Sequence, residues 1–152
     1  MKPRILVLGY GNPGRLDDGL GPALAREVDA RSLGEDVEVE TAYQLNVEDA
    51  AEVARHDVVV FADADATCAA PFELRRIEPR AEAAFTTHSV EPEGVLSLAQ
   101  DHFGAAPTAF VLGIRGYEFG GFGERLSAGA RSNLAAATDW LCRELVAGGD
   151  HA

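Results

Sequence analysis

The sequence predicts an α/β fold, a three-layer sandwich in which a mainly parallel, twisted, five-stranded sheet carries helices on both faces. Two observations predict it. Short continuous apolar runs, typical of strands covered on both faces, alternate along the chain with segments of helical periodicity. The 152 residues are 47% apolar and 25% charged, which is enough to bury one core but not two independent ones. We therefore expect a single domain over residues 1–152.

Five segments are expected to form strands. Residues 4–8, 58–62 and 109–114 are continuous apolar runs and are predicted to be central strands. Residues 37–42 alternate between apolar and polar side chains, and residues 72–77 are interrupted by charge. These last two segments are therefore predicted to lie at the edges of the sheet.

Four segments show the periodicity of helices that pack against a sheet. In the first, Leu20, Leu24 and Val28 recur every four residues. In the second, Val47 and Ala50 begin a similar stripe. The predicted helices cover residues 18–28, residues 46–55, a segment from Pro92 to about residue 103 with a cap near Ser89, and a segment from near Ser127 to the last glycine pair.

Alternating strands and helices imply crossover connections between parallel strands. If the first helix leads to an outer strand and the second returns to the other side of the first strand, strands 4–8 and 58–62 become neighbours. The connections then leave these two strands in opposite directions. Ligands bind at such a switch point, beyond the carboxyl ends of the strands.

The formal charge of −12 makes nucleic acid and anionic membrane surfaces poor partners. No stretch approaches the roughly 20 apolar residues of a membrane span, and the apolar run after the basic start is too short for a signal peptide. We therefore expect a cytoplasmic protein. The two cysteines lack the spacing of a zinc ribbon or a disulfide framework.

A glycine-rich turn, GYGNPGRLDDGLG at residues 9–21, follows the first strand and allows three interpretations. Gly9, Gly11 and Gly14 match the G-x-G-x-x-G spacing of dinucleotide sites, although the acidic pair that follows would repel a phosphate. Alternatively, Asp17 or Asp18 caps the next helix. In the third interpretation, Asp18 projects over the end of the sheet as a metal ligand or as an acid/base group.

The third interpretation gains support from two other segments. Asp63 follows the buried run VVVFA directly, where an unpaired carboxylate is costly. His88 lies in a polar loop that leads into a helix, so its ring has access to the same edge of the sheet. Two carboxylates and an imidazole suit a divalent ion such as nickel, zinc or manganese. We therefore expect Asp18, Asp63 and His88 to form a metal site with open positions for substrate or water.

Four motifs, in this order, resemble those of the nickel-iron hydrogenase maturation endopeptidases: GYGNPGRLDDGLG after the first strand, FADADA at a later strand end, THSVEPEGVLSLA leading into a helix, and GIRGYEFGGFGERLS before the last helix. The resemblance spans nearly the whole chain. It implies that Asp18, Asp63 and His88 contact the metal. It also implies that the partner is the precursor of a hydrogenase large subunit, which loses its C-terminal extension once nickel has been inserted.

On this basis we expect an endopeptidase in which Asp18 or Asp63 is the catalytic base. Nickel would be supplied by the substrate, and other divalent metals would be able to substitute for it. A second hypothesis is a metal- or nucleotide-binding module in hydrogenase assembly, without catalysis. The sequence leaves open the roles of Asp65, Glu91 and Glu93 and of the glycine cluster at residues 120–123.

Overall fold

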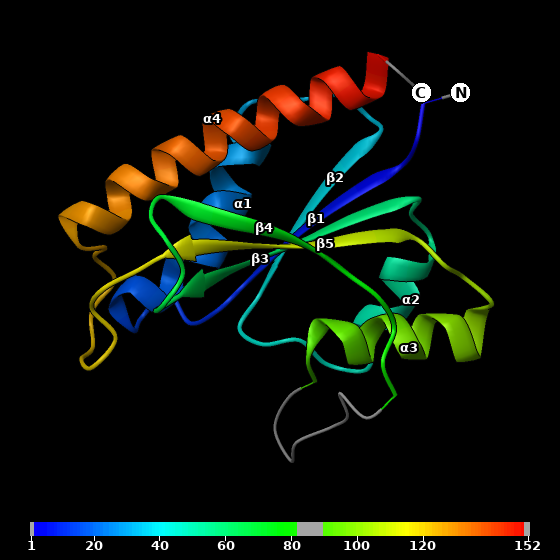
Figure 1. Ribbon diagram of the computed structural model, residues 1–152, viewed down its shortest axis with the longest axis horizontal. Helices are drawn as coiled ribbons and strands as arrows, with labels where there is room; N and C mark the ends of the chain where they lie inside the picture. Colours follow the sequence, from blue (N-terminus) through cyan, green and yellow to red (C-terminus); the bar gives the residue numbers. More distant parts are fainter. Residues whose placement is uncertain (1, 82–89, 151–152) are drawn as a thin grey trace.

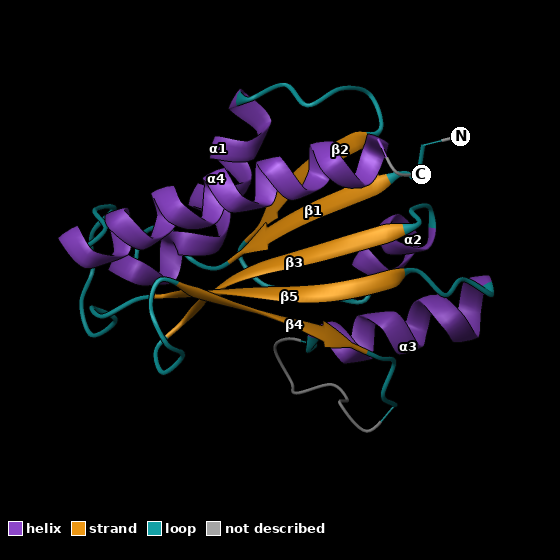
Figure 2. Ribbon diagram, turned by 45° about the horizontal axis from the view of Figure 1, so that its top comes forward, coloured by secondary structure: helices purple, strands orange, loops and turns teal. Residues whose placement is uncertain are grey.

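The computed structural model describes residues 2–81 and 90–150, and it confirms the predicted α/β sandwich (Figure 1). Its five strands form one sheet in the order β2-β1-β3-β5-β4, which Figure 2 shows from β2 to β4. All neighbouring pairs are parallel except β4 with β5. The strands are β1 (Ile5–Tyr10), β2 (Val37–Ala42), β3 (Val58–Asp65), β4 (Phe72–Ile77) and β5 (Thr108–Arg115).

The helices cover both faces of the sheet, as the sequence predicts. Helices α1 and α4 lie on one face, and α2 and α3 lie on the other (Figure 1). The helical elements are the 3₁₀ turn η1 (Leu16–Gly19), α1 (Leu20–Ala30), α2 (Asp49–Ala54), α3 (Pro92–Phe103) and α4 (Ala128–Asp150). Within the described part of the chain, no helix combines the length and the apolar character that crossing a bilayer would require.

The apolar runs form central strands because both of their faces are buried. Along β1, Ile5 and Val7 face α1 and α4, whereas Leu6 and Leu8 face α2 and α3. The alternating segment 37–42 is the edge strand β2, and the charged segment 72–77 is the edge strand β4, as predicted. Strands β1 and β3 are neighbours, so the predicted switch point lies between them.

Some boundaries differ from the prediction. Strand β3 continues to Asp65, because Asp63, Ala64 and Asp65 still pair with β5. Helix α2 is shorter than expected and begins at Asp49, so Val47 lies outside it with 51% of its surface exposed. The expected cap near Ser89 lies outside the described residues, and the N-cap residue of α3, Glu91, makes no side-chain capping bond.

Two glycines allow α1 to begin unusually close to the strand ends. A Cβ atom at Gly21 would overlap two backbone carbonyl oxygens. One belongs to Tyr10, the last residue of β1, and the other to Ala62, the last residue of β3 that pairs with β1. A Cβ atom at Gly9 would in turn overlap the carbonyl oxygen of Gly21. The glycine-rich turn thus permits backbone-to-backbone packing, which brings the start of α1 over the switch point.

Replacing Gly21 by alanine should therefore destabilise the protein by about 3 kcal/mol, because backbone atoms cannot move aside as a flexible side chain would. Urea denaturation followed by circular dichroism measures this loss. The matched control is Gly120→Ala, since a Cβ atom there would meet no neighbouring atom within 4 Å. Equal stability of the two variants would contradict the close-packing argument.

Candidate functional site

Asp63 lies at the switch point, on the face of the sheet that α2 and α3 cover. Its neighbour two residues earlier, Phe61, is part of the core on that face, and alternate residues of a strand share a face. The Asp63 side chain is partly buried and lines a polar pocket of about 110 Å³ together with Tyr10, Glu73 and Arg75. The predicted carboxylate is therefore accessible from a small crevice.

Burial raises the pKa of the Asp63 carboxyl to about 7. Hydrogen bonds from the Tyr10 hydroxyl and from the backbone of Ala64 oppose this increase, while the charges of Asp18 and Asp65 add to it. Such a carboxyl changes its charge near neutral pH, whereas an ordinary aspartate is fully ionised there.

Tyr10 also belongs to this site, although no sequence motif marks it as a functional residue. Burial, followed by the charge of Asp63 and the hydrogen bond to it, raises the Tyr10 pKa far above its usual value, so the phenol stays neutral and donates to the carboxylate. Gly9 pairs with Ala62 across β1 and β3, which puts Tyr10 beside Asp63. The strand register was thus the signal for this contact.

Asp18 lies in the 3₁₀ turn before α1 and is not part of the lining of the polar pocket beside Asp63. Its charge is close enough to contribute to the raised pKa of Asp63. Its Oδ2 atom accepts a hydrogen bond of 2.8 Å from the backbone N–H of Asn12, and it does not cap the helix. The third predicted ligand, His88, lies outside the described residues, so the meeting of all three ligands stays a prediction.

The capping role considered for Asp17 is wrong. Asp17 is completely buried, and its carboxylate accepts hydrogen bonds from the backbone N–H groups of Tyr117, Glu118 and Ser127, at 2.7 to 2.9 Å, and from the Ser127 hydroxyl at 2.7 Å. Burial favours the neutral carboxyl, but these bonds outweigh it and hold the pKa of Asp17 below its ordinary value. Asp17 therefore fastens the loop before α4 to the glycine-rich turn.

The hydrogen bonds of this turn also weigh against the dinucleotide interpretation. The N–H of Asn12 donates to Asp18, and the N–H of Gly14 donates to the side-chain oxygen of Asn12 at 2.9 Å. A pyrophosphate site needs backbone N–H groups that are free to face the ligand. Here these two donors already have partners within the turn.

The remaining acidic candidates have structural partners. Asp65 accepts hydrogen bonds from the backbone N–H groups of Thr67 and Cys68, which with the Thr67 hydroxyl hold the pKa of Asp65 low despite partial burial. Glu91 pairs with Arg80 at 3.4 Å, and Glu93 pairs with Arg75 at 3.2 Å. Of these residues, Asp65 and Arg75 line the crevice.

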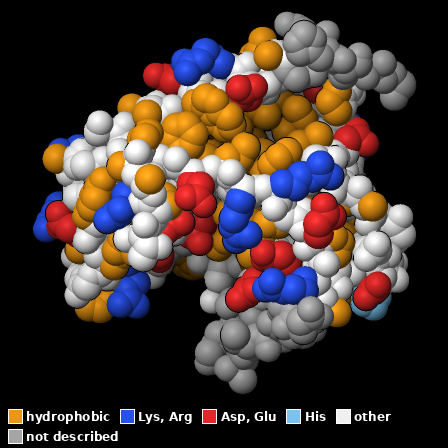
Figure 3. Space-filling model, viewed as in Figure 1, with side chains coloured by type: hydrophobic (Ala, Val, Ile, Leu, Met, Phe, Trp, Pro, Cys, Tyr) orange, Lys and Arg blue, Asp and Glu red, His pale blue; other side chains and the backbone are white. Residues whose placement is uncertain are grey.

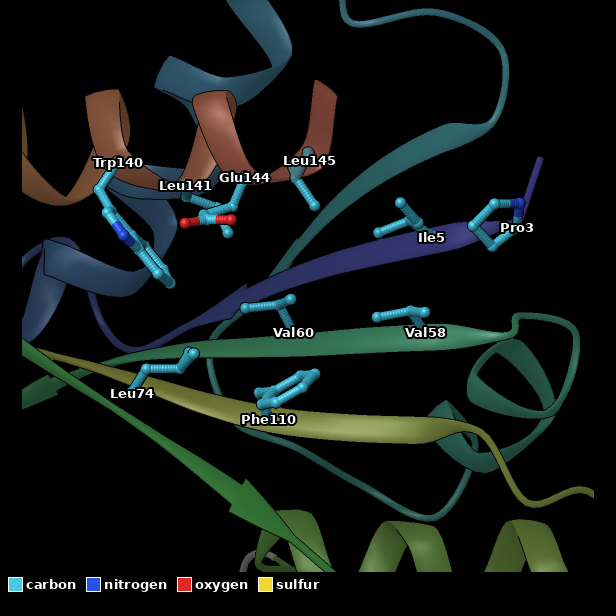
Figure 4. A pocket seen from close by; sticks show the side chains of 10 residues that line it. All are labelled: Pro3, Ile5, Val58, Val60, Leu74, Phe110, Trp140, Leu141, Glu144 and Leu145. Carbon is cyan, nitrogen blue, oxygen red and sulfur yellow. The ribbon is translucent and has the colours of Figure 1, made fainter. Parts of the chain in front are cut away.

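A larger, apolar cavity of about 380 Å³ lies between α4 and the other face of the sheet. Figure 3 shows hydrophobic side chains gathered on this side of the molecule. In Figure 4, Trp140, Leu141 and Leu145 of α4 face residues of the strands across the cavity. Its lining includes Ile5 and Val58, the first residues of β1 and β3, so it is separate from the crevice at the carboxyl ends.

No protein-family profile matches the sequence, and no curated protein is significantly similar to it. Solved structures are similar. The hydrogenase 2 maturation peptidase of a Thaumarchaeota archaeon is 25% identical, with a TM-score of 0.69, over 93% of this chain and 97% of that one. The chain has the fold of the hydrogenase maturation peptidases. The resemblance predicted from the four motifs is thereby confirmed.

Two further maturation-peptidase structures share this fold at lower identity. The [NiFe] hydrogenase maturation protease HycI of Thermococcus kodakarensis is 22% identical, with a TM-score of 0.74, over 95% of this chain and 93% of that one. The maturating endopeptidase HybD of E. coli is 24% identical, with a TM-score of 0.73, over 96% and 94%. The maturation-peptidase fold thus extends over nearly the whole chain.

Replacing Asp17 by asparagine should lower the free energy of unfolding by about 3 kcal/mol, because an amide cannot accept all four buried hydrogen bonds. Since the pKa of Asp17 lies below its ordinary value, its contribution is complete above about pH 4 and is lost as the pH falls further. Chemical denaturation at neutral pH measures the loss. Asp29→Asn, on the exposed face of α1, is the control, and equal stability of the two variants would refute the role of Asp17.

Asp63 should have the opposite effect on stability. Because its folded pKa is raised to about 7, the native state keeps a proton that the unfolded chain has lost, and stability falls as the pH rises from about 4 to 7. Asparagine cannot ionise. The free energy of unfolding of the wild type, relative to Asp63→Asn, should therefore decrease across this range. Asp101→Asn, at an exposed position of α3, is measured alongside as the control, and a difference for Asp63→Asn that does not vary with pH would rule out the raised pKa.

Proposed function

We propose that this protein is an endopeptidase that removes the C-terminal extension of a nickel-loaded hydrogenase large-subunit precursor. The observation that carries the proposal is the pair of carboxylates at the switch point of a maturation-peptidase fold. Asp18 and Asp63 come from separate strand ends, and the charge of one influences the other. Acting on such a precursor makes the cytoplasm the expected location.

The proposed metal ligands are Asp18, Asp63 and His88. His88 lies outside the described residues, and its place in the set is what the THSVEPEGVLSLA motif implies. The oxygen, oxygen, nitrogen set suits nickel and leaves coordination positions for the substrate.

Nickel belongs to the precursor in this proposal, and other divalent ions are able to substitute for it. When bound, the ion would polarise the carbonyl of the scissile peptide. The protein contributes the ligands that orient the ion, and Asp18 or Asp63 takes the proton from the attacking water. Tyr10 is proposed as a positioning residue, because its hydroxyl fixes the orientation of the Asp63 carboxylate.

The test mixes the purified protein with nickel-loaded and nickel-free precursor and measures the mass of the large subunit. We expect a shortened product from the nickel-loaded precursor alone. Asp63→Asn combined with His88→Ala should reduce the cleavage rate at least about a hundredfold, because both the base and a ligand are affected.

The matched control is Asp101→Asn combined with His102→Ala, which changes the same residue types at exposed positions of α3. It should cleave like the wild type. Cleavage at the same rate with and without nickel would overturn the proposed mechanism, and so would an unchanged rate in the Asp63 and His88 double variant. Tight binding of the precursor without any cut would favour the alternative, a binding module in hydrogenase assembly.

A further inference from the structure

A second group of potential metal ligands lies between β2 and α2. Glu38 belongs to β2, Glu52 belongs to α2, and His56 follows α2. One ligand atom from each residue lies within 4.8 Å of the other two. Glu38 pairs in register with Leu6, near the beginning of β1, so this group is at the opposite end of the sheet from the Asp63 crevice.

The ring of His56 is oriented as a metal ligand would be. Its Nδ1 atom lies 2.8 Å from the backbone carbonyl oxygen of Glu52, an acceptor, so Nδ1 carries a proton. In the neutral ring, Nε2 then has a free lone pair. A backbone carbonyl on the other ring nitrogen is the usual support of a metal-bound histidine.

The Nε2 atom of His56 is buried without a hydrogen-bond partner. The side chain is completely buried, and Nε2 makes no hydrogen bond. Its nearest charged neighbour is the carboxylate of Glu38, at 3.4 Å. A lone pair that faces a carboxylate in a buried site is unfavourable unless a proton or a cation lies between them.

The two carboxylates also need a positive charge. One carboxylate oxygen of Glu38 and one of Glu52 lie within 4.8 Å of each other and of a ring nitrogen of His56, so two like charges converge on one point. Glu40, two residues after Glu38 on β2, and Asp49, the first residue of α2, add negative charge nearby.

Two arginines on the outer side of the cluster supply part of the positive charge that balances the two carboxylates. Arg4 pairs with Glu38 at 3.3 Å, and Arg55 pairs with Glu52. Both arginine side chains are more than half exposed, so they neutralise the outer carboxylate oxygens and do not reach the buried Nε2 atom. The inner side of the cluster still lacks a cation.

We propose that Glu38, Glu52 and His56 bind a divalent transition-metal ion of the zinc type. Two carboxylate oxygens and one imidazole nitrogen are three of the four ligands of a tetrahedral site, and water completes it. The ion lies between the two carboxylates and gives Nε2 a partner. It links the edge strand β2 to α2, so it stabilises the fold and does not depend on the peptidase proposal.

The test counts bound zinc by equilibrium dialysis and elemental analysis near neutral pH. The full chain carries Asp63→Asn and His88→Ala, so that the proposed nickel ligands do not contribute. We expect about one zinc ion per chain and a higher melting temperature with zinc. Adding Glu38→Gln to this background should weaken zinc binding at least about tenfold.

The matched control is Glu35→Gln, an exposed acid shortly before β2, which should leave zinc binding unchanged. Nitrogen-15 NMR of the histidine rings provides a second readout, since zinc should shift the Nε2 resonance of His56 while Nδ1 stays protonated. Absence of bound zinc, zinc binding that Glu38→Gln leaves unchanged, or a His56 ring with protons on both nitrogens in the presence of zinc would overturn the proposal.

Discussion

The close approach of α1 to the ends of β1 and β3 is the contact on which the candidate site depends. It exists because Gly9 and Gly21 have no Cβ atoms, so backbone meets backbone where other residues would hold the helix away from the sheet. The approach brings the turn with Asp18 over the strand end with Asp63. The glycine-rich motif is thus explained by packing, and it needs no phosphate ligand.

Adjacent aspartates in this turn have opposite roles. Asp17 is buried, and its carboxylate accepts four hydrogen bonds that keep it ionised. It therefore holds the loop before α4 in place. Asp18, the next residue, accepts a hydrogen bond from the backbone N–H of Asn12, and its charge influences Asp63. The Asp63 carboxyl has few hydrogen-bond donors around it. Burial raises its pKa, and the charges of its acidic neighbours add to this increase. The number of local donors decides which carboxylate is available for chemistry.

The sequence predicted the five strands, the four helices and the switch point correctly, because burial on one or both faces leaves a clear periodic pattern. It also predicted that Asp63 lies at a strand end. The roles of Asp17 and Tyr10 depend on contacts between segments: Asp17 meets a loop about 100 residues away, and Tyr10 meets Asp63 only through strand register. The cluster around His56 was not predicted for the same reason, since the sequence before β3 does not indicate that His56 lies beside Glu38 of β2.

The central claim is that Asp18 and Asp63, held together by this packing, receive a metal ion with His88. A crystal structure of the full chain soaked with nickel or cadmium tests it most directly. The account predicts anomalous density between the two carboxylates, with a ring nitrogen of His88 at about 2 to 2.4 Å from the ion. Density absent from this crevice, with His88 ordered on another part of the surface, would contradict it.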